Sequence, residues 1–127
     1  MRVLIVDDEK ETREIMLCIF RKKGLVAEAA SSGREAIGLI ARNKPDIIIF
    51  NLTLSEEDGF ETGKQLNENP RTQDIPIIFL SAIRGSCGFL DKLPNTKVKY
   101  IEKPCKIRYL IRESNKLIAD SFPRQPR

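Results

Sequence analysis

Short, strongly apolar runs alternate along this chain with longer segments in which apolar residues recur at helical spacing. Two of the runs, residues 47–50 and 77–80, are apolar at every position. Central strands of a parallel sheet show this pattern because helices cover both of their faces. The alternation predicts an α/β domain built on a parallel sheet. The predicted strands are residues 3–6, 26–29, 47–50, 75–80 and 98–101, of which the first, third and fourth should be innermost.

The segments between these runs predict helices, and several of them have boundary signals. Gly24 predicts the end of the first helix. Ser32 and Glu35 have the spacing of a capping box at the start of the second. A proline at position 70 predicts the end of the third, whereas glycines make the fourth a poor helix former. The predicted helices are residues 10–23, 33–43, 59–67, 84–93 and 106–120.

Length and composition limit the classes of protein that fit. The 127 residues, 41% of them hydrophobic, suffice for one domain with its own core. The net charge of +4 comes from interspersed charges, so the sequence does not indicate a nucleic-acid partner. No apolar run approaches the roughly 20 residues that span a bilayer, and no signal sequence is evident. We therefore expect a cytoplasmic protein without a membrane association.

The three cysteines and the carboxyl-terminal residues say less about the function of the protein. Cys18, Cys87 and Cys105 lack the close spacing of a metal or redox motif, which favours a reduced, cytosolic protein. Residues 122–127 are rich in proline and arginine and are predicted to be a disordered tail or the start of a linker.

Polar residues follow four of the predicted strands. Ligands of open parallel sheets bind at the carboxyl ends of the strands, where these residues should gather. Two adjacent carboxylates after the first strand repel each other unless they share a cation, and oxygen ligands suit a divalent ion. The residues at these strand ends are Asp7 and Asp8 after the first strand, Asn51 after the third, Ser81 with its apolar neighbour Ala82 after the fourth, and Tyr100 and Lys103 at the fifth.

Together with two further motifs, these residues resemble the receiver domain of bacterial two-component response regulators. The resemblance covers residues 1–121 and implies a flavodoxin-like fold with helices on both faces of a five-stranded parallel sheet, in the strand order 2-1-3-4-5. It also implies a signalling module of a phosphorelay rather than an enzyme, partnered by a sensor histidine kinase or a phosphotransfer protein. The motifs are Val6-Asp7-Asp8, Pro45-Asp46, Asp58-Gly59-Phe60-Glu61, Leu80-Ser81-Ala82 and Tyr100-Ile101-Glu102-Lys103-Pro104.

The same resemblance implies a role for each residue of the site. Mg²⁺ would be held by Asp7, Asp8 and the residue at position 51, with a backbone carbonyl from Thr53. Ser81, Ala82 and Lys103 would stabilise the phosphoryl group. Ser81 and Tyr100 would form the conformational switch.

Asn51 departs from this pattern, because receivers have an aspartate at this position. An amide is a far poorer nucleophile than a carboxylate, so stable phosphorylation is not expected. With one negative charge fewer, the site should bind Mg²⁺ more weakly, and the fold without metal should gain stability. Lys103 is then expected to pair with Asp7 or Asp8, or to donate to the Asn51 carbonyl.

Three functions remain open at this point. The leading hypothesis is a phosphorylation-independent receiver that acts through protein contacts of residues 84–93, 98–101 and 106–120. The second is an ordinary phosphoacceptor receiver with an engineered aspartate-to-asparagine change at position 51. The third, a small cofactor-binding flavodoxin-like protein, is disfavoured because the first strand is followed by Asp7 and Asp8 instead of a glycine-rich phosphate loop. The sequence identifies neither the cognate kinase, the output nor the oligomeric state.

Overall fold

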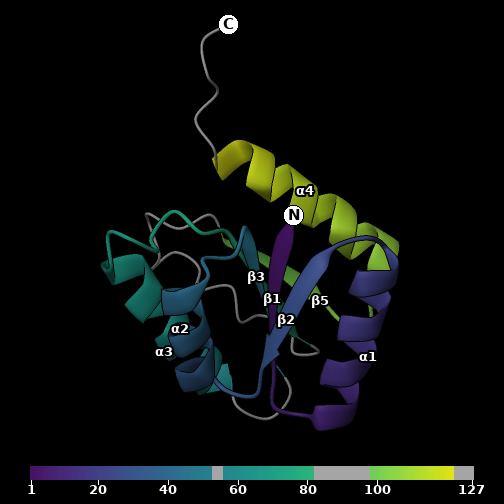
Figure 1. Ribbon diagram of the computed structural model, residues 1–127, viewed down its shortest axis with the longest axis horizontal. Coiled ribbons are helices and arrows are strands. Elements are labelled where there is room, and N and C mark those ends of the chain that lie inside the picture. Colours follow the sequence, from purple (N-terminus) through teal and green to yellow (C-terminus); the bar gives the residue numbers. More distant parts are fainter. Residues whose placement is uncertain (53–55, 82–97, 122–127) are drawn as a thin grey trace, which may run out of the picture.

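A computed structural model of the protein describes residues 1–52, 56–81 and 98–121. Five parallel strands form one sheet in the order β2-β1-β3-β4-β5 (Figure 1). The predicted strand order is confirmed, as is the inner position of β1, β3 and β4. The strands are β1 (Arg2–Asp7), β2 (Val26–Ala30), β3 (Ile47–Leu52), β4 (Ile77–Ser81) and β5 (Val98–Glu102).

Helices cover both faces of the sheet, as predicted. α1 (Lys10–Lys22) and α4 (Ile107–Ser121) lie on one face, and α2 (Gly33–Arg42) and α3 (Glu56–Glu68) lie on the other (Figure 1). Successive side chains of a strand point to opposite faces, so each buried strand contributes to two hydrophobic clusters. Val3 and Ile5 pack with α1 and α4, whereas Leu4 and Val6 pack with α2 and α3.

Aromatic rings form the centre of the cluster beneath α2 and α3. Phe50 of β3 stacks on Phe79 of β4, with ring centroids 5.3 Å apart. Phe60 of α3 meets Phe79 edge to face at 5.6 Å. Because Phe50 belongs to β3, this packing ties α3 to the strand that contains Asn51.

The helix boundaries follow the signals in the sequence. Gly24 ends the turn after α1 with a φ of +84°, a conformation that favours glycine. The Ser32 hydroxyl accepts the Glu35 N–H at 3.2 Å and caps α2. The Glu35 carboxylate accepts a hydrogen bond from Ser31 at 2.8 Å, so two serines stabilise this helix start.

Two elements start two or more residues away from the predicted position. β4 begins at Ile77, two residues late, because the Ile75 N–H donates to Thr72 O and so belongs to the preceding turn. α3 begins at Glu56, three residues early, although it then contains Gly59. Gly59 is buried, and packing of the helix outweighs the low helix propensity of glycine. The predicted helix 84–93 and the tail 122–127 lie outside the described residues.

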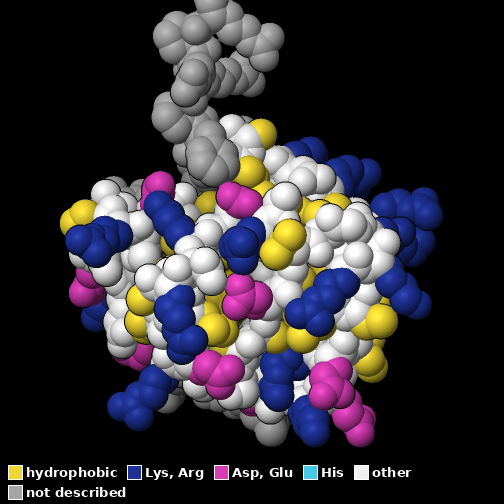
Figure 2. Space-filling view, viewed as in Figure 1, with side chains coloured by type: hydrophobic (Ala, Val, Ile, Leu, Met, Phe, Trp, Pro, Cys, Tyr) yellow, Lys and Arg dark blue, Asp and Glu magenta, His cyan; other side chains and the backbone are white. Residues whose placement is uncertain are grey.

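The surface has a mixture of charges. On the face in Figure 2, Lys and Arg side chains alternate with Asp and Glu side chains. Within the described ranges, every helix is too short or too polar to cross a membrane.

Candidate functional site

The strand register brings the predicted site residues to one edge of the sheet. Asp7, the last residue of β1, pairs with Asn51 of β3. Ser81, the last residue of β4, pairs with Leu52 on one side and with Glu102 on the other. The Lys103 N–H donates to the Ser81 carbonyl at 2.7 Å, which fixes the start of the loop after β5.

Asn51 lies at the centre of this edge and is 8% exposed. Its Nδ2 donates to Asp7 Oδ2 at 2.7 Å, while its Oδ1 is buried and accepts no hydrogen bond from the described parts of the chain. The opposite amide orientation would place an oxygen against the carboxylate, so the donor must face Asp7. The amide thus stabilises Asp7 and leaves one buried acceptor unsatisfied.

Asp7 is 1% exposed, and among the described residues it takes part in three hydrogen bonds that involve a side chain. Besides the Asn51 amide, its carboxylate accepts the Glu9 N–H at 2.9 Å. The Arg13 guanidinium donates to the Asp7 backbone carbonyl, also at 2.9 Å. Two donors therefore satisfy part of the acceptor capacity of this buried carboxylate, and the Arg13 cation lies beside its backbone. Sequence reasoning missed Arg13, because its contact depends on the path of the chain between β1 and α1.

The expectations for Lys103 are settled only in part. A hydrogen bond from Lys103 to the Asn51 carbonyl was one of three alternatives, and it is wrong, because Asn51 Oδ1 accepts none among the described residues. Pairing with Asp7 or Asp8 stays a prediction. The positive charge of Lys103 also acts on Cys105. Burial raises the pKa of the Cys105 thiol, and the charge of Lys103 lowers this pKa by a smaller amount.

The predicted switch residues occupy adjoining strands. Ser81 is buried at the end of β4. Tyr100 is half-buried, pairs with Phe79 across the β4–β5 ladder and packs on the cluster beneath α2 and α3. Thr53 and Ala82, the other two predicted site residues, lie outside the described parts of the chain.

The site contains the type of ligand atom that a magnesium ion prefers, but its side chains supply little negative charge. Mg²⁺ prefers oxygen ligands, which Asp7, Asp8 and Asn51 Oδ1 could provide. The unsatisfied Asn51 oxygen is an acceptor that a cation would satisfy. Among the described residues, however, acidic, histidine and cysteine side chains do not form a cluster of three that could hold a metal. The arrangement therefore fits a weak site.

A charged network joins β5 to α4. The buried Glu113 accepts a hydrogen bond from Lys99 of β5 and lies 3.4 Å from Lys116 Nζ. The hydrogen bond with Lys99 lowers the pKa of Glu113 and raises the pKa of Lys99. On the outer surface of α4, the Arg112 guanidinium lies 5.4 Å from the Tyr109 ring centre.

Comparison with known proteins assigns the family. Residues 3–115 match the response regulator receiver domain family. The response regulator MprA of Mycolicibacterium vanbaalenii is 29% identical over 123 residues, which are 97% of this chain and 52% of that protein. A 14.6 kDa protein from Leptolyngbya boryana is 29% identical over 112 residues, 88% of this chain and 86% of its own length.

Solved structures agree with this assignment. The receiver domain of a signal transduction histidine kinase from Syntrophus aciditrophicus has a TM-score of 0.80 and 26% identity, with 99% of this chain and 96% of that chain covered. The receiver domain of the Francisella response regulator 1452 has a TM-score of 0.78 and 28% identity, with 95% and 98% covered.

The chain belongs to the response regulator receiver domain family. Receiver domains are signalling modules of two-component systems, which interact with histidine kinases or phosphotransfer proteins and generally bind Mg²⁺ at the acceptor site. The chain spans about half the length of the MprA proteins that it matches. The family match favours the receiver hypotheses over a cofactor-binding flavodoxin-like protein.

Proposed function

We propose that this receiver, comprising residues 1–121, signals through protein contacts without stable phosphorylation at position 51. The observation that carries the proposal is the 2.7 Å hydrogen bond from the Asn51 amide to Asp7. An acceptor aspartate would direct a charged oxygen at phosphorus, whereas this side chain directs a neutral N–H at a neighbouring carboxylate. The amide therefore supports the folded state of the site and removes its nucleophile.

The remaining site residues keep the roles that the family resemblance implies. Asp7, Asp8, Asn51 and Thr53 would hold a weakly bound Mg²⁺, which supplies positive charge for a phosphoryl group. Lys103, Ser81 and Ala82 would contact phosphoryl oxygens, and Ser81 with Tyr100 would act as the switch. In a chain that lacks the nucleophile, these residues would hold the sheet edge that contains Asn51 in a single conformation.

The surface that we assign to protein partners consists of residues 84–93, β5 and α4. The Lys99–Glu113–Lys116 network fixes α4 against β5, so the described part of this surface is held in one arrangement. Tyr109 is 36% exposed there, and aromatic side chains with arginine are enriched where proteins bind each other. The partner would be a histidine kinase, a phosphotransfer protein or an output protein in the cytoplasm. Nucleic acid, membrane binding and catalysis are not part of the proposal.

A second function is favoured by the completeness of the site around Asn51. Ser81 and Lys103 are the residues that the family resemblance expects at a phosphoryl group, and the Lys103 N–H is hydrogen-bonded to the Ser81 carbonyl. Asp7 and Asn51 pair across neighbouring strands. These features fit an ordinary phosphoacceptor receiver in which an aspartate at position 51 has been replaced by engineering. The two hypotheses differ in what the aspartate version of the chain would do.

Intact mass spectrometry after exposure to Mg²⁺ and acetyl phosphate tests both hypotheses. The protein itself should stay unmodified, and a hydroxylamine-sensitive phosphate on it would contradict the proposed function. The informative comparison is Asn51→Asp, with Asn115→Asp on the exposed surface of α4 as the matched control for added charge.

The outcome for Asn51→Asp separates the two hypotheses. Uptake of one phosphoryl group by this variant alone would show an intact acceptor site and favour the engineered-receiver hypothesis. A folded Asn51→Asp variant that remains unmodified would favour a module that works without phosphate. Adding Lys103→Ala to Asn51→Asp should suppress any uptake if Lys103 contacts the phosphoryl group.

A further inference from the structure

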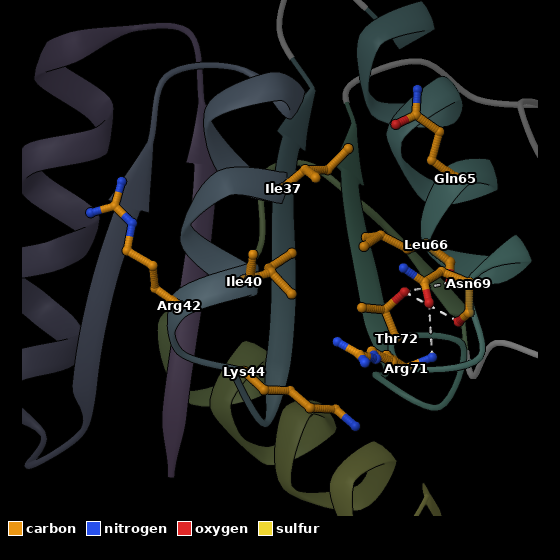
Figure 3. A pocket seen from close by; sticks show the side chains of 10 residues that line it. Ile37, Ile40, Arg42, Lys44, Gln65, Leu66, Asn69, Arg71 and Thr72 are labelled. Atoms are coloured by element: carbon orange, nitrogen blue, oxygen red, sulfur yellow. Dashed lines mark hydrogen bonds between the residues drawn. The ribbon is translucent and has the colours of Figure 1, made fainter.

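A groove of about 520 Å³ lies between α2 and α3 (Figure 3). It lies away from the edge that contains Asn51, because its lining comes from the C-terminal parts of both helices and the chain after α3. α2 and α3 run opposite to the strands, and the groove lies along their last turns and the chain that leads into β4. Its floor is apolar and includes Ile37, Ile40 and Leu66. Small-molecule sites have volumes of about 300–1,000 Å³ and combine such floors with a few polar groups. The size and lining of the groove therefore suit a small ligand.

One end of the groove carries positive charge. Lys44 and Arg71 line it, and Figure 3 shows both side chains extending toward this end. Lys44 Nζ is paired with Asp74, with distances of 3.0 and 3.3 Å to the two carboxylate oxygens. Arg71 donates its backbone N–H to Asn69 Oδ1, and its guanidinium has no partner among the described residues. Two cations and one anion leave a net charge of +1, which matches a monoanion.

The wall next to Arg71 is held in place by hydrogen bonds. The Thr72 hydroxyl donates to the Leu66 carbonyl at 2.7 Å, and the Thr72 N–H donates to the Asn69 carbonyl at 2.9 Å. These bonds close the turn after α3 and fix the backbone from which the Arg71 side chain projects. Arg42 also lines the groove, but its guanidinium points away from it (Figure 3).

We propose that this groove binds a small organic carboxylate, with the apolar body of the ligand on Ile37, Ile40 and Leu66 and its carboxylate at Arg71. The planar guanidinium matches a carboxylate with two parallel hydrogen bonds, which a point charge cannot reproduce. The single net charge at this end favours a carboxylate over a dianionic phosphate ester. The inference is independent of the proposed function, because the residues at Asn51 take no part in it.

Phenylbutyrate is a suitable probe, with phenylbutanol as its neutral counterpart. Titration of isotope-labelled protein, followed by amide proton–nitrogen correlation spectra, would locate the binding. We expect a Kd of order 1 mM, as for a ligand of about twelve non-hydrogen atoms at ordinary ligand efficiency. The shifts should centre on the amides of Ile37, Ile40, Leu66 and Thr72, and phenylbutanol should bind more weakly.

Three variants test the assigned contacts. Arg71→Gln should weaken phenylbutyrate by about 1.4-fold to fivefold, the range for a solvent-exposed ion pair, and should abolish the preference over phenylbutanol. Gln65→Trp places an indole on the exposed wall of the groove and should reduce the binding of both compounds. Arg108→Gln removes an exposed arginine from α4 on the opposite face and should change neither affinity.

Several results would overturn the proposal. Absence of binding, equal binding of acid and alcohol, or unchanged affinity in Arg71→Gln would each do so. Shifts centred outside the groove would show that the carboxylate prefers another site. Shifts at the groove that grow with protein concentration, without ligand, would show that a second copy of the chain occupies it.

Discussion

Replacing Asn51 by aspartate should destabilise the fold when divalent ions are absent. The Asn51 amide donates to Asp7 Oδ2 at 2.7 Å, and both side chains are buried. The substitution replaces this donor with a second carboxylate at the same place. Asp7 would keep the Glu9 N–H and the neighbouring Arg13, but it would lose its contact across the sheet and gain a like charge.

The magnitude follows from two terms. A hydrogen bond to a charged group contributes about 1.5–3 kcal/mol to stability. Two like charges 4 Å apart repel by about 4 kcal/mol at an effective dielectric constant of 20, and relaxation of the side chains reduces this cost. The two terms together set an upper limit of about 5.5–7 kcal/mol, and hydration and movement of the side chains lower it. We expect a net loss of about 2–4 kcal/mol, which is a large part of the roughly 5–15 kcal/mol that stabilises a typical domain.

Urea unfolding at neutral pH, with EDTA or with Mg²⁺, measures this loss. A metal ion that binds only the folded state adds about 2.7 kcal/mol when its concentration is a hundred times the dissociation constant. Mg²⁺ should therefore restore much of the stability of Asn51→Asp and should change that of the original protein far less. Asn115→Asp controls for added charge at an exposed position.

A second control exchanges the two groups. The double variant Asp7→Asn with Asn51→Asp keeps one amide and one carboxylate at the paired positions, and it should recover part of the loss. Equal stability of Asn51→Asp and the original protein in EDTA would refute the reasoning. So would a loss of the same size in Asn115→Asp.

Three further predictions concern other parts of the molecule. The hydrogen bond from Lys99 lowers the pKa of Glu113 in the folded protein. Ionised Glu113 therefore contributes its full stability above the ordinary carboxyl pKa of about 4.3, and this contribution is lost as the pH falls through the lower pKa of the folded state. The difference in unfolding free energy between the original protein and Glu113→Gln should therefore shrink as the pH is lowered through this range. A difference that stays constant with pH would contradict the pairing of Glu113 with Lys99. Burial raises the pKa of Cys105, so its alkylation by iodoacetamide, followed by peptide mass spectrometry, should have a midpoint above the usual thiol value of about 8.5. Ser32→Ala removes the cap of α2 and should cost about 1 kcal/mol in urea unfolding, and an unchanged stability would contradict this capping role.

Much of the fold was predictable because each strand and helix is marked locally. Apolar runs predicted the strands, and Gly24 and Ser32 marked helix ends that the structure confirms. The start of α3 was predicted at Gly59 but lies three residues earlier, at Glu56, and the packing that buries Gly59 inside the helix is not a local signal. Propensity acts within one turn, and tertiary contacts override it.

The candidate site was predictable as a set of residues but not as a set of contacts. Asp7, Asn51, Ser81 and Lys103 were predicted together because the carboxyl ends of parallel strands meet at one edge. The contact of Arg13 with Asp7 and the unsatisfied Asn51 oxygen were not predictable. Both depend on where atoms of separate elements come to lie.

The sequence alone determined the order of strands and helices, the residues at the strand ends and the absence of a carboxylate at position 51. These are properties of single residues and of local periodicity, which need no knowledge of the packed state. Only the tertiary structure decided that the Asn51 amide donates to Asp7, that Lys99 pairs with Glu113, and that α2 and α3 enclose a groove with Arg71 at one end. Such contacts join residues far apart in the chain, so they exist only once the helices and the sheet are packed together.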